Sequence, residues 1–418
     1  MPPLESDLLS AAAAHDVPQL KELLKEFSAQ TQHPETLNTP LHAAVASLSP
    51  ESPADGQDVA AAEETVRELL LAGAIWNDLN AAGDTPACIA RRIGPAAASC
   101  YELLVEAGVR AEILLGRLQG WGVLGSDGSD DDGDDDDDGD GDGDGDGDGD
   151  GDGDGDGGGD GDGDAPKPNK KEQGADGGAA ADVTSAAYLA SRLRYDADTS
   201  LLDADANGVM MAWERGIMER SVAELLRDTG AAGTAQRVLN VGFGMGIVDA
   251  EFQARVGGAR GGTHVIVEAH PDVLRKMDAD GWSARPGVTV LRGRWQDVLP
   301  PLLAAGDQCA PFDAIYFDTF AEDYAALKTF FCEFVIALLA EHGRFGFFHG
   351  LGADRQVCYD VYTRVVELDL LEAGFDTLWV DVPIGPEGED QGRWKGVRRA
   401  YWNVGNVYRM PVCTFIGS

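Results

Sequence analysis

The chain has 418 residues with an ordinary apolar fraction of 44%, which is enough for more than one domain and for a sizeable core. Its formal net charge is −41, but 21 aspartates and no basic residue lie between Asp127 and Asp164, which leaves −20 on the rest. Because so acidic a surface repels phosphates, the composition argues against direct nucleic-acid binding.

Cysteine usage and the apolar runs indicate in which cellular compartment the protein is expected. The six cysteines form no CxxC pair, so we expect neither a zinc site nor a disulfide framework, and no metal. The N-terminus, "MPPLESDLLS", lacks a basic region followed by a long apolar stretch, and the longest apolar run, "FFCEFVIALLA", is too short to span a bilayer. We expect a soluble intracellular protein without a membrane partner.

Residues 1–115 read as helical and repetitive. "NTPLHAAVA" and "GDTPACIARR" start two units, and the helices "TVRELLLAGA" and "YELLVEAGV" follow them. This resembles the ankyrin repeat, although the two starts are 46 residues apart and the stretch "SLSPESPADGQDV" would have to be an insertion. The alternative is a plain helical bundle. An ankyrin-like domain would supply a docking surface for another protein.

Residues 116–182 hold a Gly-Asp tract. Glycine has the most backbone entropy to lose on folding, and like charges repel, so we expect a disordered acidic linker. A calcium site is disfavoured, because the terminal Glu and flanking helices of an EF-hand are missing. Attraction of a basic protein partner is the alternative role.

Residues 183–418 alternate apolar runs with helical patterns. "RVLNVGFG", "HVIVEAH", "VTVLRG", "FDAIYFDTF" and "GRFGFFHG" read as strands, and helical stretches lie between them. This order predicts an α/β domain with a parallel sheet, whose ligands bind at the carboxyl ends of the strands.

A glycine loop follows the first of these strands. Gly242, Gly244 and Gly246 let the backbone turn sharply and approach a ligand closely, but Ile247 stands where a dinucleotide-binding fingerprint needs glycine. The next strand ends in Glu268, which can accept hydrogen bonds from ribose hydroxyls. Loop and acid together predict an adenosyl cofactor. A purely structural glycine turn is the alternative.

Further along, "GRWQDVLP" follows the third strand. Trp295 could stack on adenine, but packing in the core is as good an interpretation of this residue alone. Asp297 could reach the exocyclic amine of the adenine or cap the next helix.

Two carboxylates indicate a cation site. Glu214 lies among Met210, Met211 and Met218 in what reads as an apolar helix, where an unpaired charge would be costly. Asp318 ends the apolar run "FDAIYF", where it could simply cap the following turn. The sharper hypothesis is that Glu214 and Asp318 share a bound cation.

Several motifs in register carry a family resemblance. "YDADTSLL…VMMAWERGIM", "VLNVGFGMGIVD", "VIVEAHPDVL", "GRWQDVLP" and "FDAIYFDTF" together resemble guanidinoacetate N-methyltransferase and its fungal and plant relatives, the type 2 protein arginine methyltransferases. "FHGLGADRQVCYDVY" and the ankyrin-like N-terminus favour the second group. The resemblance implies a Rossmann-like class I methyltransferase domain. It also implies a monomer in the cytoplasm and nucleus.

The resemblance also implies site residues. Glu214 and Asp318 would grip a guanidinium and form the catalytic pair. Asn240 departs from the Asp or Glu that many methyltransferases carry two residues before the first glycine. The residues implied to contact S-adenosylmethionine are Tyr188, Met210, Met218, Gly242, Phe243, Gly244, Met245, Gly246, Ile247, Val248, Glu268, Ala269, His270, Arg294, Trp295 and Asp318.

The implied reaction is methylation of the internal (δ) guanidino nitrogen of arginine in a protein, with a ribosomal protein of the L12 type as the substrate that the group suggests. The ankyrin-like repeats would dock that partner. One alternative is a methyltransferase for a small guanidino compound such as guanidinoacetate, and another is a catalytically dead ankyrin scaffold. The stretch "GRWKGVRRAYW" could contact nucleic acid, but a late strand with solvated basic residues is the expected interpretation.

Overall fold

A computed structural model defines the fold. The residues that it describes are 3–51, 56–124, 185–196, 199–227, 235–257, 261–306, 310–385 and 390–418. The Gly-Asp tract, and with it the expectation of a disordered linker, lies outside these residues. Of the described residues, those within 3–113 and 185–418 belong to one compact unit. The expected division into three domains stays a prediction.

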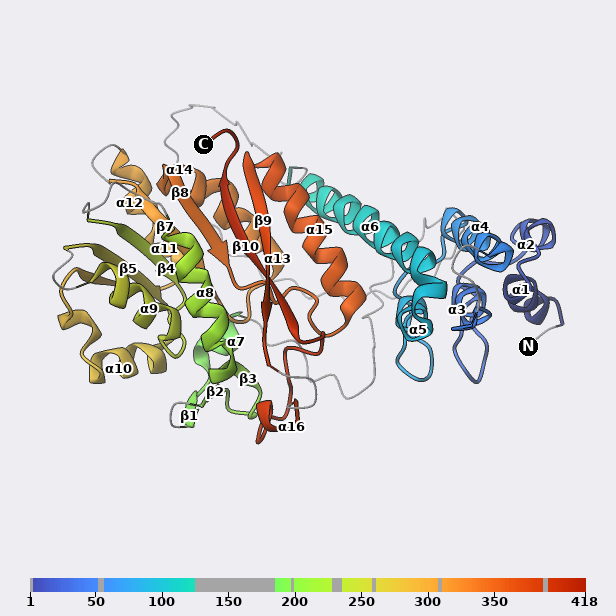
Figure 1. The fold of residues 1–418 in the computed structure, drawn as a ribbon, viewed down its shortest axis with the longest axis horizontal. Helices are drawn as coiled ribbons and strands as arrows, with labels where there is room; N and C mark the ends of the chain where they lie inside the picture. Colours follow the sequence, from blue (N-terminus) through green and yellow to red (C-terminus); the bar gives the residue numbers. More distant parts are fainter. Residues whose placement is uncertain are drawn as a thin grey trace, which may run out of the picture. The chain divides into compact units, whose positions relative to one another are not determined.

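A seven-stranded sheet forms the centre of the C-terminal part, with the strand order β6-β5-β4-β7-β8-β10-β9 (Figure 1). Its strands are β4 (Arg237–Val241), β5 (Thr263–Glu268), β6 (Val288–Arg292), β7 (Phe312–Phe317), β8 (Leu339–Phe347), β9 (Phe375–Pro383) and β10 (Val407–Phe415). The first five are parallel to their neighbours, and β10 runs antiparallel to β8 and β9. The chain order reverses at β4, so a crevice is expected at the carboxyl ends of β4 and β7.

Both faces of β4, β5 and β7 are buried, which explains their nearly continuous apolar sequences. Along β7, Ala314 and Tyr316 point into one core, and Ile315 and Phe317 point into the other. Helices α8 (Arg215–Leu225), α9 (Ile247–Val256) and α10 (Pro271–Ala279) cover the first face. The second face is covered by α11 (Trp295–Val298), α13 (Tyr324–Thr329), a π-helix (Phe330–Val335), α14 (Ile336–Leu338) and α15 (Gln356–Glu372).

The segment before β4 contains a small antiparallel sheet that corrects one expectation. It follows α7 (Ser185–Ala190) and consists of β1 (Arg194–Asp196), β2 (Ser200–Leu202) and β3 (Gly208–Met211). Met210 and Met211 therefore lie on a strand, not on a helix. Glu214 ends a short 3₁₀ turn that joins β3 to α8. The β-branched Val209 and the glycine before it suit a strand better than a helix.

A second correction concerns residues 392–402, which were expected to form a late strand. They contain the end of the short helix α16 (Asp390–Arg393) and then irregular backbone, and β10 begins only at Val407. Two further short elements are α12 (Pro300–Ala304) and the turn Trp282–Ala284.

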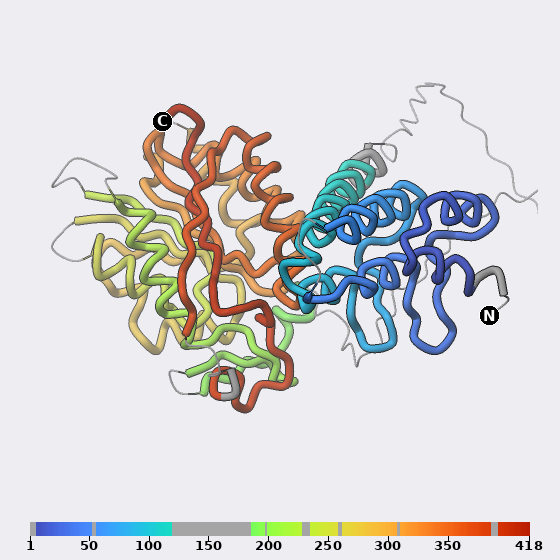
Figure 2. The backbone as a smooth tube through the Cα atoms, turned by 45° about the vertical axis from the view of Figure 1, so that its right-hand side comes forward, coloured from blue at the N-terminus to red at the C-terminus, as the bar shows by residue number. Residues whose placement is uncertain are grey.

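Helices alone make up the N-terminal part that the structure describes. They are α1 (Pro3–Ala13), α2 (Val17–Leu23), α3 (Pro40–Ala46), α4 (Gln57–Leu71), α5 (Pro86–Ile93) and α6 (Ala98–Leu124), preceded at α6 by the turn Pro95–Ala97. Helix α1 packs on α3, and α3 packs on α5 (Figures 1 and 2). None of the helices in the described ranges is long and apolar enough to cross a bilayer.

The two Thr-Pro starts are helix starts with the same chemistry. Thr39 and Thr85 are the N-caps of α3 and α5, each followed by proline at the first helical position. His42 accepts a hydrogen bond at Nδ1 from the Thr39 backbone N–H (3.2 Å), so its Nε2 carries the proton that is donated to the Asp84 carbonyl (3.0 Å). The start of α3 is thereby hydrogen-bonded to the residue that precedes the N-cap of α5. Burial lowers the pKa of His42, which keeps the imidazole neutral.

The core of these helices continues into the C-terminal part. Val357, Val361 and Val365 of α15 belong to the same apolar cluster as residues of α1 to α6. At Gly108 of α6 an added Cβ would lie 2.6 Å from Val361 Cγ2. Tyr101 donates a hydrogen bond to Asp360 (2.5 Å) at the same junction.

We predict that Thr39→Ala lowers the free energy of unfolding of the N-terminal helices by about 1 kcal/mol, because α3 loses its cap. Thr39→Ser is the matched control, since it keeps the hydroxyl and should stay near wild type. Urea unfolding followed by circular dichroism measures both. Equal stability of the alanine and serine variants would show that the cap contributes nothing.

Candidate active site

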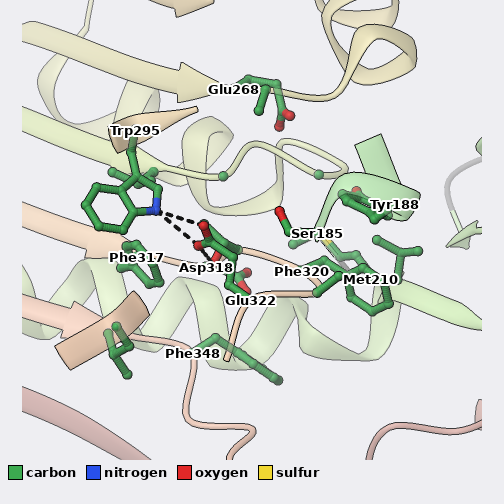
Figure 3. Close-up of a pocket in the computed structure, with 18 of the residues that line it drawn as sticks. Ser185, Tyr188, Met210, Glu268, Trp295, Phe317, Asp318, Phe320, Glu322 and Phe348 are labelled. Atoms are coloured by element: carbon green, nitrogen blue, oxygen red, sulfur yellow. Dashed lines mark hydrogen bonds between the residues drawn. The ribbon is translucent and has the colours of Figure 1, made fainter. Parts of the chain in front are cut away.

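A cavity of about 260 Å³ opens at the carboxyl ends of β4, β5 and β7, where the strand order predicts a ligand site (Figure 3). Its walls include the loops after these strands, α7, β3 and the loop after β8. Ten of the sequence-predicted residues line it: Tyr188, Met210, Glu214, Gly242, Gly244, Glu268, Ala269, Arg294, Trp295 and Asp318.

The glycine loop is shaped by close approaches. Gly242 has φ +94°, and a Cβ there would lie 1.9 Å from the Asp318 carbonyl oxygen. Gly244 has φ +54°, and its Cβ would lie 2.8 Å from Met210 Sδ. Glycine is therefore required at both positions by conformation and by space. The loop joins β4 to α9 directly beneath the cavity.

Glu268 ends β5 with a buried carboxylate. Its oxygens accept hydrogen bonds from the backbone N–H groups of Phe243 (2.9 Å) and His270 (2.6 Å). Burial raises the pKa of Glu268, and these backbone donors oppose that shift by favouring the charged form. The carboxylate is thus fixed at the mouth of the glycine loop, in position to accept hydroxyl donors.

Asn240, the departure noted from the sequence, is part of a buried network under the loop. Its amide nitrogen donates to the Asp249 carboxylate (3.0 Å), and Nε2 of His264 lies 3.0 Å from the same group. Asn240 also donates to the Gly242 carbonyl (2.8 Å). The network under the loop therefore contains a carboxylate, but Asp249 on α9 supplies it and residue 240 on β4 does not.

Trp295 and Arg294 line the cavity without the expected geometry. The Trp295 ring packs edge-on against Phe330 (5.3 Å between centroids) and Phe334 (5.2 Å), and its Nε1 donates to Glu322. This supports the core interpretation of Trp295 over stacking on a ligand. Arg294 is exposed, and its guanidinium pairs with the Asp297 carboxylate (2.9 Å).

Several residues predicted to contact the cofactor do not line the cavity. Met218 is fully buried in the sheet core, where the Tyr316 hydroxyl donates to its sulfur (3.3 Å), and it is not among the residues that line the cavity. The loop side chains from Phe243 onward turn into the core, because β4 and α9 bury their apolar residues there. The other residues outside the lining are Phe243, Met245, Gly246, Ile247, Val248 and His270.

Glu214 and Asp318 line the same cavity, as the sequence predicted. Figure 3 shows Asp318 among the lining residues. Glu214 is 2% exposed and its Oε1 accepts from the Met211 N–H (2.8 Å). Asp318 Oδ2 is buried and has no hydrogen-bond partner among the residues that the structure describes. Within the described residues, no Lys, Arg or His forms an ion pair with either carboxylate.

This arrangement makes both groups reluctant to ionise. Burial raises the pKa of each carboxyl group, and a neighbouring carboxylate raises it further: Asp318 acts on Glu214, and Asp249 acts on Asp318. A cation placed between Glu214 and Asp318 would favour the ionised form of both carboxyl groups and lower their pKa values. The pair is therefore suited to hold a cation.

The sequence alone missed two side chains of the site. Glu322 accepts from Trp295 Nε1 (3.0 Å), Gln296 (2.8 Å) and the Thr319 hydroxyl (2.7 Å). Its place four residues after Asp318 was an available signal. Tyr401 donates a hydrogen bond to Glu214, and no sequence pattern connects residues 187 positions apart.

Comparison with known proteins agrees with the motifs. The family model described as guanidinoacetate N-methyltransferase matches residues 179–347. A protein named protein arginine N-methyltransferase 2 from Aspergillus fumigatus is 46% identical, with 98% of this chain and 96% of the relative covered. Its namesakes from Neurospora crassa and Saccharomyces cerevisiae are 44% and 35% identical, over 100% and 94% of this chain and 96% and 87% of their own lengths.

The chain belongs to the protein arginine N-methyltransferase 2 family. The resemblance found in the motifs is thereby confirmed. Family membership makes the chain a methyltransferase. S-adenosylmethionine is the methyl donor that the motif resemblance implies.

The residues of the cavity fit this donor. Gly242 and Gly244 line the cavity with bare backbone, and Glu268 offers carboxylate oxygens to ribose hydroxyls. Tyr188 contributes an aromatic wall, held against His270 (4.8 Å) and Phe320 (4.9 Å).

We predict that Gly242→Ala weakens binding of S-adenosylhomocysteine more than about tenfold, because the added methyl collides with the Asp318 backbone. Gly374→Ala is the control, since Gly374 has nearly the same φ (+90°) but open space around it. That control should lose about 1–2 kcal/mol of stability from backbone strain and keep its affinity. Calorimetric titration and thermal unfolding measure both, and equal affinity of the two variants would contradict the role of Gly242.

Proposed function

We propose that this chain transfers the methyl group of S-adenosylmethionine to the δ nitrogen of an arginine in a protein, with a ribosomal protein of the L12 type as substrate. The observation that carries the proposal is the buried pair Glu214 and Asp318, which lacks a cation among the described residues. A guanidinium is planar, always charged and able to donate to two carboxylates at once. The family name supports arginine as the acceptor.

Both carboxylates position the guanidinium, and Asp318 also accepts its proton. S-adenosylmethionine, when bound, supplies an electrophilic methyl carbon on a sulfonium. Glu214 and Asp318 hold the guanidinium N–H groups, so that the lone pair of the δ nitrogen can be turned toward that carbon. As the N–C bond forms and the C–S bond breaks, the nitrogen gives up its proton, and Asp318 is the acceptor.

Magnitudes decide the timing of that proton transfer. A guanidinium has a pKa of about 13.8 and an ordinary Asp a pKa of about 3.9, so simple deprotonation in water would cost roughly 13 kcal/mol. The raised pKa of Asp318 narrows this gap and does not close it. Proton removal therefore accompanies methyl transfer.

The N-terminal helices are proposed to be an ankyrin-like array that docks the protein substrate. The repeated Thr-Pro helix starts and the His42–Asp84 link between them support this. A small guanidino compound would need no such surface, although the family model matched to residues 179–347 keeps guanidinoacetate as the second candidate.

Product analysis decides between the candidates. The full chain is incubated with methyl-labelled S-adenosylmethionine and either a purified L12-type ribosomal protein or guanidinoacetate, and the labelled protein is hydrolysed to identify the methylarginine isomer. Label in δ-methylarginine from the protein is the expected result. Label only in the small compound, or only on a terminal guanidino nitrogen, would overturn the proposal.

The carboxylate pair gives a sharper prediction. Asp318→Asn and Glu214→Gln should each reduce turnover by roughly 10²- to 10⁴-fold and change cofactor affinity far less, because both act mainly on the acceptor. Asp313→Asn on the same strand and Glu219→Gln on α8 are matched controls outside the cavity. Methylation by Asp318→Asn at the rate of Asp313→Asn would remove Asp318 from the mechanism.

The pH dependence follows from the raised pKa values. Substrate binding and proton acceptance need ionised carboxylates, so kcat/KM should rise with pH on a limb set by the folded protein. Since burial raises the pKa of both groups above the ordinary 4.5 of Glu and 3.8 of Asp, that limb should lie above the usual carboxyl range. A rate that stays flat down to pH values near 5, measured with saturating cofactor, would contradict this.

A further inference from the structure

Tyr401 lies in the cavity wall and reaches Glu214 from a distant part of the chain. Its hydroxyl donates a hydrogen bond to Glu214 Oε1, the oxygen that also accepts from the Met211 N–H (2.8 Å). Tyr401 lines the cavity beside Glu214. Within the described part of the chain, Glu214 Oε2 has no hydrogen-bond partner, so the two oxygens of this carboxylate are not equivalent.

The segment 394–402 belongs to the basic and aromatic stretch 392–402 that was expected to be a strand. It is attached to the start of β3 through its backbone. The Gly208 N–H donates to the Arg399 carbonyl (3.2 Å), and the Arg398 N–H donates to the Ala206 carbonyl (2.8 Å). These bonds fix the segment to the residues at the start of β3, and β3 leads to Glu214.

Aromatic packing fixes the Tyr401 ring. Trp394 meets it edge-on (4.9 Å between centroids), and Trp213 lies roughly parallel to it (6.1 Å). A Cβ at Gly208 would lie 3.1 Å from Tyr401 Cε1, so glycine there allows the ring to approach the strand closely. The ring is therefore placed by its surroundings, and its hydroxyl has a defined target.

The charges around this hydroxyl keep it a donor. Burial and the carboxylate of Glu214 raise the pKa of Tyr401 well above its ordinary value, so it stays protonated. Among the described residues, the titratable groups that face Glu214 are Tyr316 of β7, Asp318 directly after β7 and Tyr401 of the segment 394–402. Of these, Tyr401 donates a hydrogen bond to Glu214, which favours its ionised form.

We propose that Tyr401 is a positioning residue for methyl transfer: its hydroxyl occupies Oε1 of Glu214, turns Oε2 toward the guanidinium, and favours the carboxylate that the guanidinium requires. The inference rests on the proposed function, because it assigns the guanidinium to Glu214. It gives the segment 394–402 a role in the site rather than in nucleic-acid contact.

The test compares Tyr401→Phe, which keeps the ring and removes the hydroxyl, with Tyr362→Phe. Tyr362 on α15 donates to Glu112 (3.0 Å), so the control removes a tyrosine–carboxylate hydrogen bond outside the cavity. With an L12-type ribosomal protein as acceptor, Tyr401→Phe should lower kcat/KM roughly 10- to 100-fold and move the acid limb of its pH profile to higher pH. Affinity for S-adenosylhomocysteine should match that of the control. An unshifted pH profile would overturn the inference.

A second measurement is independent of the acceptor. The raised pKa of Glu214 means that the folded protein binds this proton more tightly than the unfolded chain, so stability falls as pH rises from the ordinary carboxyl range through the raised pKa. Without the Tyr401 hydroxyl, Tm should fall more between about pH 5 and about pH 9 than in wild type or Tyr362→Phe. Equal falls in all three proteins would overturn the inference. An inactive wild type would instead refute the proposed function.

Discussion

The energetic constraint on this site is the burial of two carboxylates beside each other without a cation among the described residues. Water would stabilise these charges strongly, and the protein interior replaces that solvation with only a few donors. Glu214 receives one backbone N–H and one tyrosine hydroxyl, whereas Asp318 Oδ2 receives none. The fold must hold this unfavourable pair in place, and a bound guanidinium would repay the cost.

The parallel sheet provides the rigidity that this requires. The Asp318 N–H donates to the Val241 carbonyl (2.8 Å), and the Asp318 carbonyl lies against Gly242. Asp318, directly after β7, and the cofactor loop after β4 are therefore held together as one structural unit. Their relative position is set by sheet hydrogen bonds rather than by flexible loops.

Much of this could be predicted from local sequence. Strand runs such as "FDAIYF" and the glycines of "VGFGMG" report their own conformation, and Glu268 and Asp318 follow strands directly, so their shared edge could be inferred. Met218 and Trp295 could not be placed, because apolar side chains beside a strand end serve the core and a ligand equally well. Tyr401 could not be found, because its partner comes from another part of the chain and the link depends on tertiary packing.

The apolar cluster shared by the N-terminal helices and α15 changes how the two parts can evolve. Val357, Val361 and Val365 complete a core whose other members lie before residue 110. The helical segment is therefore not an exchangeable module, because any replacement must supply a surface that matches α15. Substitutions in α6 that disturb this core will change the stability of the enzyme, even where they contact nothing in its active site.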